Sequence, residues 1–305
     1  MRKPDFLVLL LCIPFTLWGQ SFSVRLDSAQ AALNRNDFVY AASWSRQIIE
    51  EDSHQYEAFR IRAKAYLELG YYTLCTEDLN YLMNHTLPRA TDFANRGYAF
   101  YMLQEYKAAR SDFRKAFELD TTSALFAFNL ASSEDALNKW KEAHLHFTKA
   151  IKLKPDYTEA YTKRGHILLR QELFTLAIMD FDSALKYHQN DGLLLLYRGM
   201  ALTSLKKYKE AIALFDRCIR LKSNIAPAYY NRGLARFQQR DYKNAQADLD
   251  SAILINPNME IAYYNRALCK MELAPKSYPT ACDDFQKAVS LGFMEALVYL
   301  KKYCE

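Results

Sequence analysis

The sequence has little glycine and proline and no large excess of charge of either sign. Only 8 of its 305 residues are glycine and 8 are proline, whereas half of them are hydrophobic. This composition excludes a collagen-like or low-complexity disordered chain and leaves enough apolar surface for a continuous core. The net charge is +5 and no polybasic block occurs. We therefore expect neither nucleic acid nor an anionic membrane as the partner.

The sequence also lacks the motifs of common catalytic and metal sites. It contains no His-Glu-x-x-His, no glycine-rich phosphate loop and no Gly-x-Ser-x-Gly. Among the six histidines, His144 and His146 are two residues apart, so on a helix they point to different faces and cannot chelate one metal. We expect a protein that is not an enzyme and that binds no cofactor and no metal.

The N-terminus differs in character from the rest of the chain. Two basic residues precede an apolar run of 13 residues, Phe6–Trp18, which is too short to cross a bilayer comfortably. Small and polar residues follow this run. The pattern predicts a signal peptide over residues 1–19, cleaved after Gly19 or, as second choice, after Ser21. A secreted or periplasmic location would follow, with no membrane span after cleavage; an uncleaved anchor is the alternative.

The remaining chain repeats with a period of 34 residues. Position 8 of every unit is Ala or Gly, position 20 is small and position 17 is aromatic; the eighth unit needs two inserted residues near Ala274–Pro279 to keep this register. Small residues allow two helices to approach closely, and the aromatic side chains fill the space between units. The units span 22–55, 56–89, 90–123, 124–157, 158–191, 192–225, 226–259 and 260–293.

These positions, with Ala at 27 and Pro at 32, resemble the tetratricopeptide repeat, and the resemblance covers about residues 22–295. It implies an all-α, right-handed superhelical solenoid of helix–turn–helix units. We expect residues 294–305 to form a C-terminal capping helix. The first unit departs most from the pattern, with Arg25 at position 4 and Ser45 at position 24, as a terminal repeat can.

Arginine at position 7 occurs together with aspartate at position 23 of the same unit. Five units have this combination: Arg62 with Asp78, Arg96 with Asp112, Arg164 with Asp180, Arg232 with Asp248, and Arg266 with Asp284. Arg198 is the exception, because Leu214 takes the place of the aspartate. We predict five ion pairs, each joining the two helices of one unit; arginines that await an acidic ligand are the alternative.

The cysteines divide into two groups. Cys75, Cys218 and Cys269 occupy positions where other units have small residues, so we expect them in the core. Cys282 and Cys304 do not, and we predict a disulfide between them that fixes the C-terminal cap, with two free thiols as the alternative.

The resemblance implies a concave groove lined by positions 2, 5, 9, 12 and 13 of the first helix of each unit. These positions are unusually apolar here, which is typical of an interaction surface; mutual packing in a tight superhelix is the alternative. The candidate groove residues are Tyr98, Tyr101, Phe128, Leu196, Met200, Tyr230, Leu234, Phe237, Tyr264 and Leu268, with Lys163, His166 and Arg170 as a polar cluster in the fifth unit. The clamp with which some family members hold a terminal carboxylate is not reproduced, since its Lys at position 5 and Asn at position 9 are missing.

The sequence thus predicts a non-catalytic scaffold that binds a protein or peptide segment in its groove. A periplasmic chaperone or assembly factor for exported envelope proteins is the alternative. An enzyme would need the cluster of Lys163, His166 and Arg170 as its site. The sequence leaves the oligomeric state open.

Overall fold

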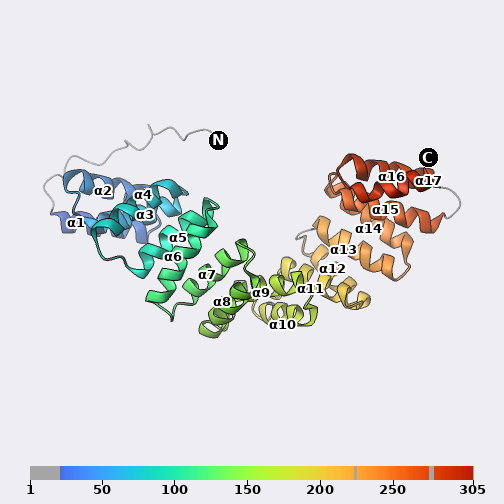
Figure 1. The fold of residues 1–305 in the computed structure, drawn as a ribbon, viewed down its shortest axis with the longest axis horizontal. Coiled ribbons are helices and arrows are strands. Elements are labelled where there is room, and N and C mark those ends of the chain that lie inside the picture. Colours follow the sequence, from blue (N-terminus) through green and yellow to red (C-terminus); the bar gives the residue numbers. More distant parts are fainter. Residues whose placement is uncertain (1–20, 223–224, 275–277, 305) are drawn as a thin grey trace. The chain divides into compact units, whose positions relative to one another are not determined.

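The computed structural model describes residues 21–222, 225–274 and 278–304, and in these ranges every regular element is helical (Figure 1). Each predicted 34-residue range contains two helices, here called the A and B helix. The helices are α1 (Phe22–Asn34), α2 (Phe38–Glu51), α3 (Tyr56–Glu68), α4 (Tyr72–His85), α5 (Ala90–Met102), α6 (Tyr106–Leu119), α7 (Ala124–Ala136), α8 (Trp140–Leu153), α9 (Thr158–Arg170), α10 (Phe174–Leu185), α11 (Gly192–Ser204), α12 (Tyr208–Arg220), α13 (Ile225–Gln238), α14 (Tyr242–Ile255), α15 (Glu260–Leu273), α16 (Pro279–Ser290), the short 3-10 helix η3 (Met294–Ala296) and α17 (Leu297–Tyr303).

The chain divides into two compact units, residues 1–154 and 155–305, which we call the N-terminal and the C-terminal unit. The N-terminal unit contains α1–α8 and the C-terminal unit contains α9–α17. The predicted signal peptide, residues 1–19, lies outside the described residues. In the described ranges no helix is both long and apolar enough to cross a membrane.

Close approach of the two helices in a pair explains the small residue at position 8. A Cβ atom added to Gly199 would lie 2.5 Å from Cε1 of Phe215, and one added to Gly165 would lie 2.7 Å from Cε1 of Phe181. Both phenylalanine rings are fully buried. The ring at position 24 therefore occupies the space that a methyl group at position 8 would need, and alanine fits only where the ring is placed differently.

The turn between the helices of a pair repeats one backbone conformation. Its central residue has positive φ in Asn36, Gly70, Gln104, Asn138, Glu172, Lys206 and Arg240. The next N–H donates to a carbonyl five residues earlier, as from Lys207 to Leu202 at 2.8 Å. This is the Schellman arrangement that ends many helices. Six of these seven residues carry a side chain, although the left-handed conformation costs such residues about 1 to 2 kcal/mol.

All five arginine–aspartate pairs expected within units are formed in the structure. The shortest N–O distances are 2.7 Å for Arg62–Asp78, 2.7 Å for Arg96–Asp112, 2.6 Å for Arg164–Asp180, 2.5 Å for Arg232–Asp248 and 2.5 Å for Arg266–Asp284. The aspartates are buried. Burial raises the pKa of Asp78 above its ordinary value, and the hydrogen bonds from Arg62 offset part of that shift. These pairs join the A helix to the B helix of the same unit.

The same arginines make a second contact that the sequence analysis missed. Their partner is position 25 of the preceding unit, on its B helix. The distances are 2.7 Å for Arg96–Asn80, 2.6 Å for Arg198–Asp182, 2.5 Å for Arg232–Asp216 and 2.7 Å for Arg266–Asp250. Arg198, which lacks an aspartate in its own unit, is thus paired with the preceding unit. An arginine at position 7 therefore connects successive helix pairs as well as the helices within one pair.

The fourth unit reverses the charges of this arrangement. Its A helix α7 carries Glu134, which is fully buried, and its B helix α8 carries His146, whose Nδ1 lies 2.6 Å from the Glu134 carboxylate. Arg110 of α6 donates to the same carboxylate at 3.1 Å. A buried carboxylate needs such partners, because an unpaired charge away from water is costly. The link between three helices is thus kept with the acid and the bases exchanged.

A disulfide joins Cys282 to Cys304 and attaches α17 to α16. On α17, the Tyr299 ring stacks on Phe285 with centroids 5.0 Å apart and meets Tyr264 edge-on at 5.5 Å. This short helix covers the core of the last pair, as a capping element does. The other three described cysteines, Cys75, Cys218 and Cys269, are free and buried, and burial raises the pKa of Cys75 and of Cys269 to about 12.

Candidate functional site

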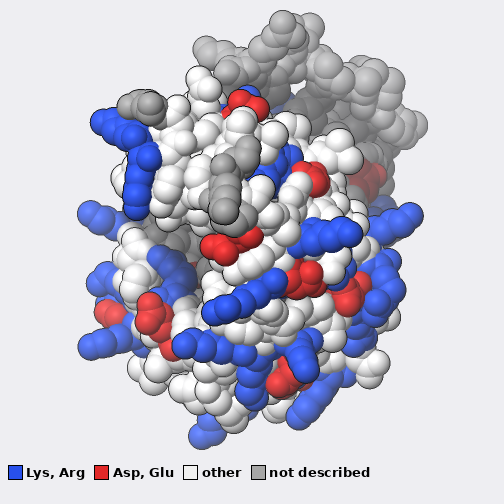
Figure 2. Space-filling view, turned by 90° about the vertical axis from the view of Figure 1, so that its right-hand side faces the viewer, with Lys and Arg blue, Asp and Glu red and all other residues white. Residues whose placement is uncertain are grey.

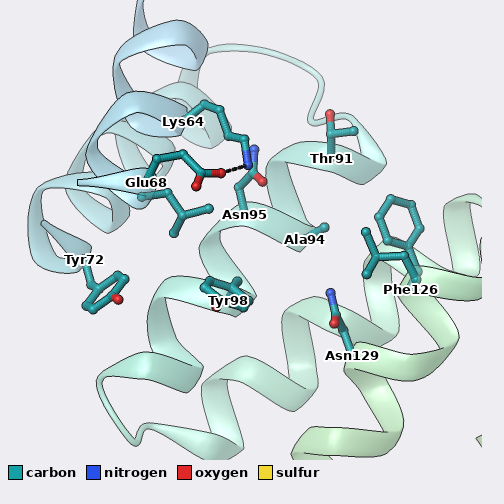
Figure 3. A pocket seen from close by; sticks show the side chains of 11 residues that line it. Lys64, Glu68, Tyr72, Thr91, Ala94, Asn95, Tyr98, Phe126 and Asn129 are labelled. Atoms are coloured by element: carbon teal, nitrogen blue, oxygen red, sulfur yellow. Dashed lines mark hydrogen bonds and ion pairs between the residues drawn. The ribbon is translucent and has the colours of Figure 1, made fainter. Parts of the chain in front are cut away.

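A cavity of about 640 Å³ opens between the A helices α3, α5 and α7 of the N-terminal unit (Figure 3). This volume is in the usual range for ligand sites. Because equivalent positions of successive A helices lie side by side, one helix face of each contributes to the wall. We call this cavity the pocket; its lining residues are Lys64, Leu67, Glu68, Tyr72, Thr91, Ala94, Asn95, Tyr98, Leu125, Phe126 and Asn129.

Two asparagines give the pocket its uncharged polar groups. Asn95 and Asn129 occupy position 6 of α5 and α7, and both point into the pocket (Figure 3). Neither side chain makes a hydrogen bond to another residue within the described ranges. Each carboxamide has two N–H donors and an acceptor oxygen. The pocket therefore presents donors and acceptors that a bound molecule can use.

Apolar surface lies beside these amides. Tyr98 on α5 and Leu125 on α7 leave 42% and 54% of their surface exposed, although both are large hydrophobic residues. Phe126 and Ala94 beneath them are buried, so the exposed side chains lie on a packed base. A pocket with apolar walls and a few polar groups is the usual form of a binding site.

One ion pair lies on the α3 side of the pocket. Lys64 Nζ is 2.5 Å from Glu68 Oε1, and the two residues are four positions apart on the helix (Figure 3). They are the charged members of the lining set. The pocket wall therefore carries no net charge.

Comparison with known proteins agrees with this arrangement of helices. The sequence profile of the tetratricopeptide repeat matches residues 226–259, and a second tetratricopeptide profile matches residues 128–184 and 162–224. The chain is built from tetratricopeptide repeats. The first of these matches has the range of the predicted seventh repeat.

Two curated Dictyostelium discoideum proteins match part of the chain. The "Protein STIP1 homolog" is 32% identical over 104 residues, which are 34% of this chain and 18% of that protein. The "DnaJ homolog subfamily C member 7 homolog" is 22% identical over 185 residues, which are 55% of this chain and 34% of that protein. The matched region is thus about a third or less of the length of either relative.

Solved tetratricopeptide repeat structures share the fold at low sequence identity. A repeat protein from Parabacteroides merdae has a TM-score of 0.62 at 20% identity, with 80% of this chain and 96% of that chain covered. The Cut9–Hcn1 assembly has a TM-score of 0.61 at 20% identity over 95% of this chain and 57% of that chain. YrrB, described as having an unusual peptide-binding site, has a TM-score of 0.51 at 23% identity, with 62% and 97% covered.

The candidate groove residues of the N-terminal repeats have different surroundings. Tyr98 lines the pocket. Tyr101 instead packs against the buried core, with its ring 5.3 Å from that of Tyr106, and burial raises its pKa. The Phe128 ring lies 5.5 Å from that of Phe147, a fully buried residue. Of these three candidates, the pocket therefore uses Tyr98.

In the C-terminal unit most candidate groove residues are part of the protein's own packing. Leu196 is only 5% exposed, so its assignment to a binding surface needs correction; Met200 packs against the same cluster. Tyr230 and Phe237 pack on the core of the seventh repeat, and Tyr264 and Leu268 pack on that of the eighth. Leu234 is partly buried. The sequence could not show this, because the covering residues are aromatic side chains from neighbouring repeats and from α17.

Two of these tyrosines have shifted acidity. Burial raises the pKa of Tyr230 to about 12, although Asn265 donates a hydrogen bond to its hydroxyl at 3.3 Å. Burial and a hydrogen bond with Tyr299 raise the pKa of Tyr264 to about 12. Both phenols are therefore held in their neutral form by the fold.

The polar cluster of the fifth repeat lies on α9. Lys163 and Arg170 are exposed, and the His166 ring is 5.3 Å from that of Tyr197 on α11. Within the described ranges, no three His, Cys, Asp or Glu residues are grouped in a way that could hold a metal ion.

The face in Figure 2 carries scattered Lys and Arg side chains with acidic side chains among them. Exclusion of nucleic acid as a partner stays a prediction from the sequence.

Residues that the sequence analysis did not select complete the pocket. Lys64, Glu68 and Asn129 are at positions 9, 13 and 6 of their repeats. The asparagines were considered only as parts of a carboxylate clamp. A usable signal is present in the sequence: Asn95 and Asn129 recur at position 6 of adjacent repeats, as Asn231 and Asn265 do.

Proposed function

We propose that this chain is a non-catalytic protein-interaction scaffold whose N-terminal unit binds a peptide segment of its partner in the pocket. The observation that carries the proposal is the pair of pocket carboxamides, Asn95 and Asn129, which have no hydrogen-bond partner within the described residues. A main-chain N–H and C=O would satisfy both halves of such an amide. Exposed Tyr98 and Leu125 offer apolar contact beside them.

The comparisons support the general class of this proposal. The chain consists of tetratricopeptide repeats, and YrrB is described as a repeat protein with a peptide-binding site. Interaction by a peptide segment in this chain is inferred from its own pocket. Aromatic and amide side chains on rigid helices provide binding at a low cost in conformational entropy.

The test uses a photoreactive amino acid at Thr91, an exposed pocket residue, in cells that produce the protein. We expect it to cross-link a partner, and we expect the Tyr98→Ala/Asn129→Ala variant to lose that product. The control carries the same group at Leu254, which is 82% exposed on α14. Equal cross-linking with and without the two alanine substitutions would refute binding in the pocket.

The same experiment separates a scaffold from the alternative, a periplasmic chaperone or assembly factor for exported proteins. A scaffold gives one partner in stoichiometric amount, whereas a chaperone gives many substoichiometric partners. We favour the scaffold, because the pocket walls belong to helices with packed cores, and a preformed site suits one defined segment.

We also propose that the protein is exported. The sequence of residues 1–19 and the disulfide Cys282–Cys304 support this, since disulfides persist in oxidising compartments. Mass spectrometry of the protein from its source should give an N-terminus at Gln20. An intact Met1 together with free thiols at Cys282 and Cys304 would contradict export.

A further inference from the structure

The charge arrangement of the pocket limits the kind of segment that it can hold. Its only charged residues among the described lining set are Lys64 and Glu68, which form an ion pair 2.5 Å long. Both side chains are 40% exposed, so the pair lies at the mouth of the pocket and not in its base. A bound segment therefore meets a cation and an anion together.

A carboxylate gains little from such a pair. Attraction to Lys64 and repulsion from Glu68 act over similar distances and largely cancel, since both energies fall as the inverse of distance. The carboxylate must still lose water on entering, and this loss is costly when no free cation compensates for it. A protonated amine meets the same cancellation with the signs reversed.

An uncharged main chain suits the pocket better. Asn95 and Asn129 can donate to a carbonyl and accept from an N–H, and an extended segment leaves both groups unused along its length. A helical segment would have bonded those groups within itself. Tyr98 and Leu125 offer apolar surface for a side chain of the segment.

We propose that the pocket selects an internal, uncharged and extended stretch of a partner chain, and that Glu68 excludes carboxylates by neutralising Lys64. This inference rests on the proposed function and adds the chemistry of the partner segment. Glu68 acts as a specificity residue: it needs no contact with the segment, because it sets the charge that an anion meets.

The test starts with a synthetic library of nine-residue peptides with acetylated and amidated ends. Peptides retained by the wild-type protein but not by the Tyr98→Ala/Asn129→Ala variant define binders, and we expect them to lack Asp and Glu in the middle of the sequence. Absence of any such peptide would overturn the proposed function, and this inference with it.

One binder is then made in three forms: with the amidated end, with a free carboxylate at the end of the bound stretch, and with a single internal Asp. We expect the wild type to bind the amide at least about tenfold more tightly than either anionic form. In Glu68→Gln, which frees Lys64, affinity for both anionic peptides should rise about tenfold and that for the amide should stay the same. The gain should shrink at high salt.

Two variants keep the test specific. Glu68→Asp retains the charge and should restore discrimination against carboxylates. Lys64→Gln leaves Glu68 unpaired and should weaken the anionic peptides further. If binders exist but the wild type prefers the free carboxylate, or if Glu68→Gln leaves the ratio unchanged, the inference is wrong and the proposed function stands.

Discussion

Position 6 of the A helix holds asparagine in both compact units, and the two sets of side chains make different contacts. Asn95 and Asn129 of the N-terminal unit leave their amides to the pocket. In the C-terminal unit, Asn231 donates to the carbonyl of Pro227 at 2.8 Å, and Asn265 donates to Ile261 and to the Tyr230 hydroxyl.

The neighbouring side chains differ in the same way. Tyr98 is exposed beside the N-terminal asparagines, whereas Tyr264 meets Phe293, Phe285 and Tyr299 with ring centroids 5.0 to 5.9 Å apart. Both tyrosines lie at positions that the family pattern assigns to the groove. The repeat position alone therefore does not define a binding residue; the side chains that reach it from the next repeat decide.

Tyrosine truncation gives the largest contrast between the units. We expect Tyr264→Ala to lower the free energy of unfolding of the C-terminal repeats by about 3 to 4 kcal/mol, because a packed ring is lost. The matched Tyr98→Ala should change stability by less than about 1 kcal/mol while it abolishes peptide binding. Urea unfolding followed by hydrogen exchange measures both. Equal destabilisation would show that the contrast between the units is false.

Removal of the disulfide tests whether α17 keeps the C-terminal groove positions covered. Cys282→Ser/Cys304→Ser should destabilise the last repeat by about 2 to 3 kcal/mol, because the covalent link no longer restricts the unfolded chain. Amide exchange should quicken in α15–α17 and stay unchanged in α3, α5 and α7. Altered peptide binding by the pocket in this variant would contradict the separation of the two regions.

Arginine substitution compares two kinds of link within the C-terminal unit. Arg232→Ala should cost about 2 kcal/mol, because it weakens the pairing of the buried Asp248 carboxylate, with Arg236 still 2.8 Å away. Arg198→Ala should cost at most about 1 kcal/mol, since its partner Asp182 is 46% exposed. Thermal melting of the two variants checks the order, and a larger loss for Arg198→Ala would reverse it.

Titration of the buried phenols is the mildest test. Carbon-13 NMR of labelled tyrosines should show Tyr230 and Tyr264 ionising near pH 12, with single Phe substitutions to assign them. A phenol whose pKa is raised by folding is neutral in both states at low pH. Its contribution to stability is therefore complete below the unfolded value of about 10 and is lost as the pH rises toward 12. Ionisation near pH 10 would show that these side chains are exposed.

The sequence predicted the helix pairs, the repeat family, the five arginine–aspartate contacts and the Cys282–Cys304 pairing. These features depend on residues at fixed spacings within a repeat or at its end. The second contact of Arg232, with Asp216, was missed because position 25 was not compared between successive repeats. The pocket was missed because it depends on which side chains of three A helices leave space between them, and Leu196 shows that one position can be covered in one repeat and open in another.

The double contacts of the position-7 arginines have a consequence for how the C-terminal unit opens. Arg232 connects α13 to α12 and α14, Arg266 connects α15 to α14 and α16, and the disulfide connects α16 to α17. A repeat array usually loses its terminal repeats one at a time, because each contacts only its neighbours. Here no helix from α13 to α17 can detach without separating a charged pair or remaining tethered. We expect the slow-exchanging amides of these helices to open together, as one cooperative segment, and not by fraying from the C-terminal end.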